Sequence, residues 1–241
     1  MTRRIAMWSG PRNISTAMMR SWENRSDTGV VDEPFYAFYL SQTQSPHPCF
    51  EDVLQSQSHN YEQVVNELTK NACKSKIQYQ KHMTHHMLPG LDLTWTKELQ
   101  HCFLIRDPAQ VVNSYTNSRG LCSAEDIGIQ RQFELYQDIT RISGQDIPII
   151  DSNDVLRSPE KVLKLLCERI DVAFMSTMLK WPKGSRTTDG VWAKHWYENV
   201  DNSKGFASFS ATTLKLNDEQ LSVVHHVQPF YDQLYKKRIG A

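Results

Sequence analysis

The sequence has no excess of either charge, because 27 Lys and Arg residues are balanced by 27 Asp and Glu residues. Proteins that bind nucleic acids usually carry a basic excess, so this balance argues against that class of protein. No apolar run is long enough for a membrane-spanning helix, and no signal-like apolar segment follows Met1. We therefore expect a soluble cytoplasmic protein that binds neither nucleic acid nor a membrane.

Cysteine is also scarce, and its pattern excludes two further classes of protein. The cysteines are odd in number, widely spread and form no C-x-x-C pair; they are Cys49, Cys73, Cys102, Cys122 and Cys167. This pattern favours reduced thiols over a disulfide framework or a structural zinc site. The chain has no internal repeat and no low-complexity stretch, and its 241 residues suit one domain, expected to span residues 1–241.

Apolar runs alternate with helical patterns along the chain, which predicts an α/β fold with a mostly parallel central sheet flanked by helices. Strands are expected near Arg4–Trp8, Gly29–Asp32, Lys76–Gln80, His101–Ile105 and Pro148–Ile150. Helices are expected near Asn13–Glu23, Tyr61–Asn71, Ala109–Ser118 and Ala124–Ile142. The stretch from Trp181 to Ser210 has no clear period and is either a long ordered loop or a mobile lid.

Three helix starts are marked by their first residues. Ser123 is followed three positions later by Asp126, the spacing of a capping box. Ser158-Pro159-Glu160 places a proline in a first helical turn, where its missing N–H costs nothing. Asn217 and Gln220 repeat the capping-box spacing near the end of the chain. These patterns predict that helices begin at all three places.

The first candidate binding motif is the segment Trp8–Thr16, WSGPRNIST, which follows a strand and opens a helix. Backbone N–H groups and the positive end of the helix dipole attract anions at such a position. Gly10 permits a close turn, while Arg12, Ser15 and Thr16 add one positive charge and two hydroxyl groups. The Walker A pattern G-x-x-x-x-G-K-[ST] is absent. Taken alone, the segment fits an ordinary strand-to-helix turn equally well.

The second motif is Phe103–Tyr115, FLIRDPAQVVNSY, an apolar strand that ends in Arg106 before Pro108 starts a helix. Ser114 follows Arg106 by eight residues, about two helical turns into that helix. A guanidinium and a hydroxyl placed in this way can converge on one phosphate. A buried strand followed by an Arg–Asp surface pair explains the pattern less economically.

Together the two motifs resemble those of sulfotransferases. Ser9–Thr16 looks like the 5′-phosphosulfate loop of the cytosolic and carbohydrate sulfotransferases, with Asn13-Ile14 in place of the usual Ser-Gly. Arg106–Ser114 looks like their 3′-phosphate motif. The segment Asp151–Trp181 is similar to the stretch that follows the last core strand of the family.

The resemblance implies a three-layer P-loop-like fold that uses 3′-phosphoadenosine 5′-phosphosulfate as sulfuryl donor. The residues around the donor phosphates would then be Arg12, Asn13, Ser15, Thr16, Arg106 and Ser114. Sulfuryl transfer, like phosphoryl transfer, depends on aligning the acceptor with the leaving group and on neutralising charge. It also needs a base that removes the acceptor's proton.

Two segments compete for the role of base. Glu33 ends the second predicted strand, and carbohydrate sulfotransferases carry a similar Glu-Pro whose glutamate is the base. Lys81–Pro89, KHMTHHMLP, loosely resembles the Lys-Thr-His-Leu-Pro stretch of the aryl and steroid enzymes. That resemblance implies that Lys81 contacts the sulfuryl group and that His82, His85 or His86 is the base. Glu33 is our first choice.

The same histidines permit a different hypothesis, a zinc site on one helix face. No H-E-x-x-H pattern supports it, and Pro89-Gly90 would end such a helix quickly, so a polar loop at the end of a strand is favoured.

The stretch Asp189–Lys194, DGVWAK, is a partial match to a Gly-Asp-Trp-Lys-like loop that covers the nucleotide in the resembling family. This resemblance adds Arg186 and Lys194 as donor-binding candidates. Packing of a Trp-rich segment onto the core is an equally good interpretation.

The sequence therefore predicts an enzyme that transfers a sulfuryl group to a hydroxyl or amine of a small molecule. A nucleotide-dependent kinase is the second hypothesis, against which the missing Walker lysine argues. A nucleotide-binding module of the same fold without catalysis is the third. The sequence does not indicate the acceptor or the oligomeric state, and no metal is expected.

Overall fold

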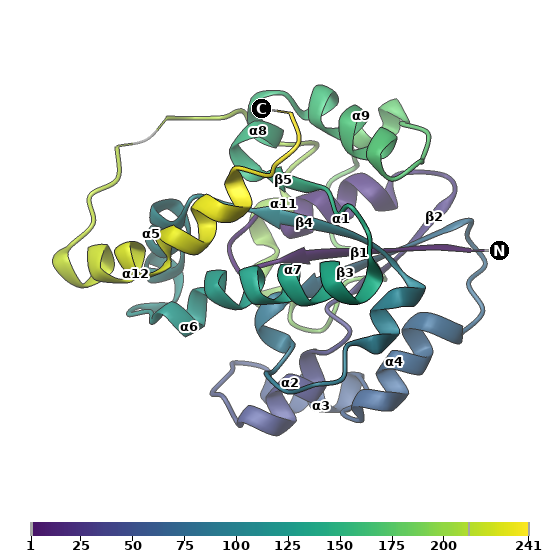
Figure 1. The fold of residues 1–241 in the computed structure, drawn as a ribbon, viewed down its shortest axis with the longest axis horizontal. Helices are drawn as coiled ribbons and strands as arrows, with labels where there is room; N and C mark the ends of the chain where they lie inside the picture. Colours follow the sequence, from purple (N-terminus) through teal and green to yellow (C-terminus); the bar gives the residue numbers. More distant parts are fainter. Residues whose placement is uncertain (1, 212, 241) are drawn as a thin grey trace.

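The fold is built on one parallel β-sheet, shown in Figure 1 with the strands running across its centre. The computed structural model describes residues 2–211 and 213–240. The strand order is β2-β3-β1-β4-β5, and the strands span Arg3–Ser9 (β1), Thr28–Asp32 (β2), Ile77–Met83 (β3), Gln100–Ile105 (β4) and Ile149–Asp151 (β5). All five predicted strands are confirmed. Strand β3 extends past its predicted end, so that Lys81 and His82 belong to the strand.

Helices cover both faces of this sheet because both faces are apolar. Side chains of a strand alternate between faces, and in β1 Ala6 and Trp8 enter one hydrophobic cluster while Ile5 and Met7 enter the other. The first face is covered by α4 (Tyr61–Lys70), α5 (Pro108–Arg119), α7 (Ile129–Ser143) and α12 (Asp218–Tyr235). The second is covered by α1 (Ser15–Glu23), α8 (Ser152–Arg157) and α9 (Pro159–Arg169). The predicted α/β architecture is confirmed.

Short elements complete the chain between these layers. They are the helices α2 (Tyr36–Thr43), α3 (Phe50–Ser56), α6 (Ala124–Ile127), α10 (Ala193–Trp196) and α11 (Glu198–Asp201), and the 3-10 turns η1 (Thr84–His86), η2 (Thr94–Glu98) and η3 (Ser176–Leu179). The segment 181–210, which the sequence left open as a loop or a lid, contains α10 and α11. It packs onto the second face through the fully buried side chains of Trp192 and Tyr197.

Two predicted helices differ in their bounds from those observed. The helix expected at Asn13–Glu23 begins at Ser15, because Ile14 lies in the left-handed region (φ 30°) outside the helix. The helix expected at Ala124–Ile142 is divided into α6 and α7 at Gly128, which adopts φ 63°. Glycine accepts this conformation without the steric cost of a side chain.

The predicted helix starts are confirmed. Ser123 with Asp126 and Asn217 with Gln220 each form a reciprocal capping box. Pro159 lies in the first turn of α9. Within the described part of the chain, no helix combines the length and apolarity that crossing a membrane requires.

The sheet topology fixes where a ligand can bind. Strands β1 and β4 are neighbours, yet β1 continues into α1 on the second face and β4 into α5 on the first. The chain therefore diverges beyond the carboxyl ends of these two strands and leaves a crevice there. The two candidate phosphate motifs occupy these two strand ends.

A buried imidazole near the start of β4 helps to pack the first face of the sheet. Trp8 Nε1 donates a hydrogen bond to His101 Nδ1 (3.0 Å), and His101 Nε2 lies 2.8 Å from the carbonyl oxygen of Thr96. Nε2 therefore carries the proton, and Nδ1 is an acceptor. Burial lowers the pKa of His101 from 6.5 to about 4, so the imidazole is neutral in the folded protein at neutral pH.

We expect the free energy of unfolding to fall as the pH is lowered from 6.5 towards 4, because the unfolded His101 takes up a proton that the folded one does not. This residue contributes at most about 3 kcal/mol to the loss. When the free energy of unfolding is measured with urea over this pH range, it should fall less steeply with decreasing pH in His101→Gln than in the native protein. The same change at exposed His225 should leave the dependence unaltered, and an equal response of both variants would contradict the assignment.

Candidate active site

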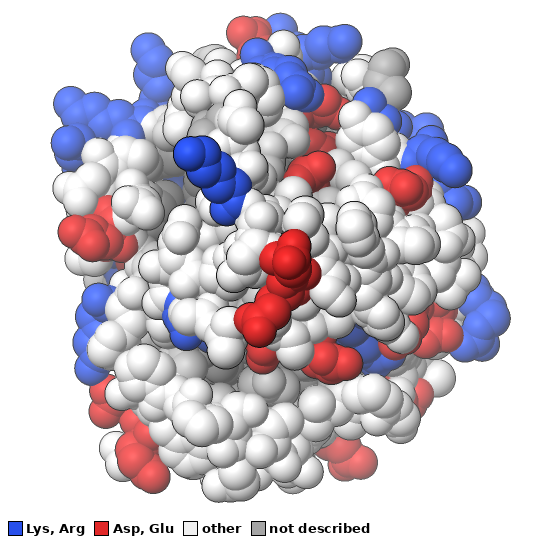
Figure 2. Space-filling model, turned by 90° about the vertical axis from the view of Figure 1, so that its left-hand side faces the viewer, with Lys and Arg blue, Asp and Glu red and all other residues white. Residues whose placement is uncertain are grey.

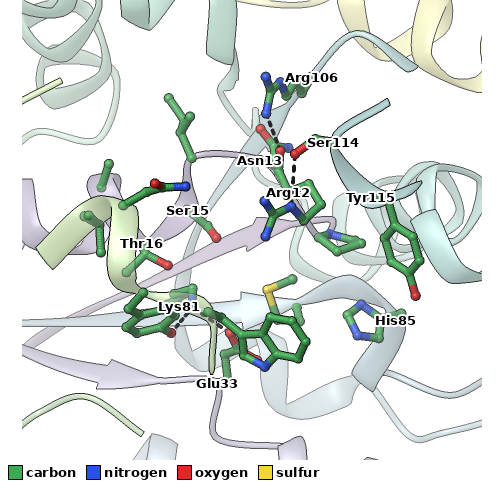
Figure 3. Close-up of a pocket in the computed structure, with 18 of the residues that line it drawn as sticks. Arg12, Asn13, Ser15, Thr16, Glu33, Lys81, His85, Arg106, Ser114 and Tyr115 are labelled. Atoms are coloured by element: carbon green, nitrogen blue, oxygen red, sulfur yellow. Dashed lines mark hydrogen bonds and ion pairs between the residues drawn. The ribbon is translucent and has the colours of Figure 1, made fainter. Parts of the chain in front are cut away.

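A cavity of about 800 Å³ opens at the carboxyl ends of the strands. Its walls come from the turn after β1, the end of β2, the η1 turn, helix α5 and the segment 196–207. Figure 3 shows Arg106 and Ser114 at one end of this cavity, Arg12 in the middle, and Lys81 and Glu33 at the other end. The cavity therefore joins the segments that the sequence singled out separately.

The turn after β1 is held in an unusual backbone conformation. Arg12 (φ 58°) and Ile14 (φ 30°) both lie in the left-handed region, which is rare for a β-branched residue such as Ile14. A side chain at Gly10 would approach the carbonyl oxygen of Ile127 to 3.1 Å. Among the described residues no side chain caps the following helix α1, so its first N–H groups remain available to an anion beside Ser15 and Thr16.

Asn13 supports this turn from beneath. Its side chain is buried, donates from Nδ2 to the carbonyl oxygen of Leu104 (2.6 Å) and accepts a hydrogen bond from the hydroxyl of Ser152. These contacts connect the turn to the ends of β4 and β5. The side-chain amide of Asn13 is thus engaged within the protein, and its place in the motif is that of an anchor for the loop.

Arg12, Arg106 and Ser114 meet at one end of the cavity. Arg12 Nε donates to Ser114 Oγ (3.0 Å), and Arg106 Nη1 donates to the carbonyl oxygen of Arg12 (2.5 Å). Arg106 Nε donates to Gln110 (3.1 Å), which aligns the guanidinium along α5. Arg106 and Ser114 therefore both contact Arg12 and line the same cavity, and their joint binding of a phosphate stays a prediction.

Neither of these two arginines has a carboxylate partner within salt-bridge distance among residues 2–211 and 213–240. Burial lowers the pKa of Arg106, and the nearby charge of Arg12 lowers it further. Burial also lowers the pKa of Arg12, with a smaller effect from Arg119. Asp107 and Asp151 partly offset these effects on Arg106 without forming a salt bridge. Two half-buried cations with no carboxylate in direct contact form a site that favours an anion.

The opposite end of the cavity is formed by an ion-paired lysine. Lys81 Nζ lies 2.9 Å from Asp32 Oδ1 and 2.6 Å from Glu33 Oε1, and the three side chains are 1%, 2% and 10% exposed. Residues Asp32 and Lys81 are adjacent in the register of β2 and β3, which brings their side chains together. The two carboxylates raise the pKa of Lys81 well above its ordinary value against the opposing effect of burial, so the lysine stays charged.

Tyr197 completes this network from the C-terminal segment. Its hydroxyl donates to Asp32 (2.7 Å) and accepts from Lys81 Nζ (2.6 Å) and from Trp192 Nε1 (3.1 Å). The network therefore ties the segment containing α10 and α11 to the ends of β2 and β3.

Glu33 lies in the left-handed region (φ 41°) at the end of this network and lines the cavity. Burial raises its pKa, and the positive charge of Lys81 opposes that rise. The carboxylate thus combines access to the cavity with an environment that strengthens it as a base.

The structure places the three histidines in different environments, although the rings of His85 and His86 are in contact, with centroids 4.4 Å apart. His85 lines the cavity, and its Nδ1 is buried without a hydrogen-bond partner among the described residues. Burial lowers the pKa of His85 to about 4, so the ring is neutral near pH 7. His86 lies behind it, stacked on Tyr36 and Tyr39, with Nε2 3.9 Å from Glu33.

His82 lies in β3 and stacks on Trp8 inside the core. The zinc hypothesis required His82, His85 and His86 on one helix face, and this premise is wrong because the strand continues through His82. Throughout the described ranges, no three His, Cys, Asp or Glu side chains gather in a way that could hold a metal ion.

Arg186 and Lys194 do not line the cavity. The guanidinium of Arg186 donates to backbone carbonyl groups of its own loop, including that of Gly184, and lies 3.9 Å from Glu23. Lys194 pairs with Asp52 (2.7 Å) on the protein surface. The structure thus separates both residues from the other donor-binding candidates and engages them elsewhere.

Several cavity residues carried no motif in the sequence. Tyr36, Tyr39, Trp196 and the cation Arg119 line the cavity and belonged to no motif, and they are joined there by Tyr115, the last residue of the second motif. Arg119 follows Tyr115 by four residues on α5, so the helical repeat from Tyr115 is the one signal that pointed towards it. Figure 2 views this side of the molecule and shows basic and acidic side chains scattered over it, with acidic side chains near the middle and no extended basic surface. The cations of the cavity are therefore a local feature.

Comparisons with known proteins agree with this geometry. A family model described as a sulfotransferase domain matches residues 3–238. Two curated proteins of Arabidopsis thaliana are 35% and 34% identical to the chain over 204 residues: branched-chain-amino-acid aminotransferase-like proteins 1 and 2. The match covers 85% of this chain and 36% of each plant protein, so the chain spans about a third of their length.

Solved structures share the fold. A sulfotransferase domain from the curacin biosynthetic pathway superposes with a TM-score of 0.55 at 18% identity, covering 95% of this chain and 98% of that one. A sulfotransferase from Alicyclobacillus acidocaldarius gives 0.57 at 7% identity, covering 98% and 95%. At such identities the likeness concerns the fold, which is the P-loop-like α/β fold expected from the sequence.

Proposed function

The chain belongs to the sulfotransferase domain family, and we propose that it transfers a sulfuryl group from 3′-phosphoadenosine 5′-phosphosulfate to a hydroxyl or amine of a small molecule. The observation that carries the proposal is the meeting of Arg12, Arg106 and Ser114 at one end of the cavity without a carboxylate partner. Such a site suits a donor that carries phosphate groups at the 3′ and 5′ positions of its ribose. The rest of the cavity suits an acceptor.

The free donor groups of these residues support this assignment. Nη1 and Nη2 of Arg12 and Nη2 of Arg106 have no hydrogen-bond partner among the described residues, while each arginine uses Nε to fix its orientation. Arg12, Ser15, Thr16 and the N-terminus of α1 would bind the 5′-phosphosulfate. Arg106 and the hydroxyl of Ser114 would bind the 3′-phosphate through charge-assisted hydrogen bonds.

In this mechanism the acceptor oxygen or nitrogen attacks sulfur from the side opposite the bridging oxygen, whose bond to sulfur breaks. Arg12 neutralises charge on the 5′-phosphosulfate, and Lys81, held charged by its two carboxylates, stabilises the charge spread over the sulfuryl oxygens. Glu33 removes the acceptor's proton. His85 is the rival base because it also lines the cavity, although its lowered pKa makes it the weaker one.

The first prediction concerns the group that is transferred. With donor labelled in the sulfuryl group, label should appear in a hydroxylated acceptor, whereas ATP labelled in its terminal phosphate should give no labelled acceptor. The physical reason is that the turn after β1 lacks the Walker A lysine, which reaches the β- and γ-phosphates of ATP in a P-loop, and carries Arg12 instead. Phosphorylation by ATP with no sulfated product would overturn the proposal, and tight donor binding with no transfer would favour a binding module.

The second prediction concerns the 3′-phosphate. The protein should bind 3′-phosphoadenosine 5′-phosphate at least about tenfold more tightly than AMP, because charge-assisted hydrogen bonds contribute about 1.5–3 kcal/mol each. Arg106→Ala should abolish this preference and leave AMP binding nearly unchanged, which calorimetry with both ligands and both proteins can measure. Arg186→Ala, outside the cavity, is the matched control and should keep the preference. An equal loss for both ligands in Arg106→Ala would mean that the residue only supports the loop.

The third prediction concerns the base. Glu33→Gln should lower kcat by about 10²–10⁴, because the base that removes the acceptor's proton is lost. The affinity for 3′-phosphoadenosine 5′-phosphate should be preserved, because Arg106 and Ser114 lie at the opposite end of the cavity (Figure 3). Asp32 still pairs with Lys81 in this variant, so the network remains partly neutralised. His85→Gln is the matched comparison. Full activity of Glu33→Gln together with inactive His85→Gln would assign the base to His85.

A further inference from the structure

Arg119 is the cation of the cavity that the proposed donor site leaves unused. It ends helix α5, more than one turn beyond Ser114, and lines the cavity. Its guanidinium carbon lies 4.0 Å from the ring centroid of Trp196 and 5.4 Å from that of Tyr115. Both rings also line the cavity, so the guanidinium is stacked in its aromatic part.

No ion pair involves Arg119 in the described ranges, whereas Lys81 and Lys194 are both paired with carboxylates. Its charge affects the pKa values of the groups around it. It contributes to the lowered pKa of His85 and of His47, both about 4, and it opposes the burial that raises the pKa of Tyr36. These three residues line the same cavity. Arg119 is thus an uncompensated positive charge among the aromatic walls.

The surroundings of Arg119 also contain acidic groups. Glu125 and Asp126 line the cavity, and Asp126 accepts a hydrogen bond from the backbone N–H of Ser123 (2.8 Å) in the capping box of α6. Glu33 is paired with Lys81. The carboxylates of Asp126 and Glu33 therefore have partners of their own. Neither they nor Glu125 forms an ion pair with Arg119 within the described ranges, so the charge of Arg119 stays available in the aromatic part of the cavity.

Building on the proposed function, we propose that Arg119 binds an anionic group of the acceptor, and that the acceptor is a small aromatic acid. The aromatic body would lie against Tyr36, Tyr115 and Trp196, with its anionic group at Arg119 and its hydroxyl turned towards Glu33. Arg12, Arg106 and Ser114 remain with the donor, so the two anion sites have separate functions. Figure 3 shows Tyr115 and His85 on the side of the cavity away from Thr16.

The test measures binding of three probes that share one phenol ring to the complex with 3′-phosphoadenosine 5′-phosphate. The probes are para-hydroxyphenylacetate, its neutral amide and the cation tyramine. By calorimetry the native protein should bind the acid about tenfold more tightly than the amide, and tyramine most weakly. Arg119→Gln should abolish the preference for the acid and leave amide affinity unchanged, and Arg119→Lys should keep part of the preference. High salt should weaken the preference, because Arg119 is exposed.

The control variant is Arg141→Gln, which removes the same charge from the exposed end of α7 and should keep the preference. Equal affinity of the native protein for acid and amide would overturn the proposal, as would a preference for tyramine or an equal loss for both probes in Arg119→Gln. Because binding is measured without turnover, these outcomes are independent of catalysis. A selective acid site in a protein that transfers no sulfuryl group would instead contradict the proposed function.

Discussion

The ion pair network of Lys81 is the interaction on which the candidate active site depends. A lysine with 1% of its side chain exposed is stable as a cation only because Asp32, Glu33 and the hydroxyl of Tyr197 all contact its ammonium group. Removing one partner of such a buried pair costs about 3–5 kcal/mol, since a charge is left without compensation. The network also fixes Glu33 at the cavity and holds the segment containing Tyr197 against the sheet, so stability and site geometry depend on the same contacts.

Two other cations of the cavity lack the carboxylate partners that neutralise Lys81. Arg12 and Arg106 lie close enough to lower the pKa of Arg106, and neither has a carboxylate partner in the described part of the chain. This arrangement stores electrostatic repulsion that a bound anion would relieve. The left-handed conformations of Arg12 and Ile14 add backbone strain in the turn that follows β1. Packing beneath the turn, through Asn13 and Ser152, maintains these conformations.

Much of the fold was predictable because its signals are local. Apolar runs identified all five strands, and capping residues such as Ser123 and Asn217 identified helix starts. Helix bounds were less predictable where the backbone left the helical region, as at Ile14 and Gly128. Helices α2 and α3 were missed because neither shows one repeating apolar face. The buried residues of α2 are divided between the two hydrophobic clusters, with Phe38 in one and Tyr36 and Leu40 in the other, and α3 buries Val53 alone.

The sequence by itself determined the fold class and the pair of motifs that include Arg12, Arg106 and Ser114, because each motif joins a strand end to a helix start within a few residues. Only the tertiary structure decided which of the other candidates share a cavity. It brought Glu33, Lys81 and His85 together, buried His82 in the core, and left Arg186 and Lys194 outside. It also added Tyr197 and Arg119. The reason is that strand order and the path of the C-terminal segment depend on packing between residues distant in sequence, for which no local pattern exists.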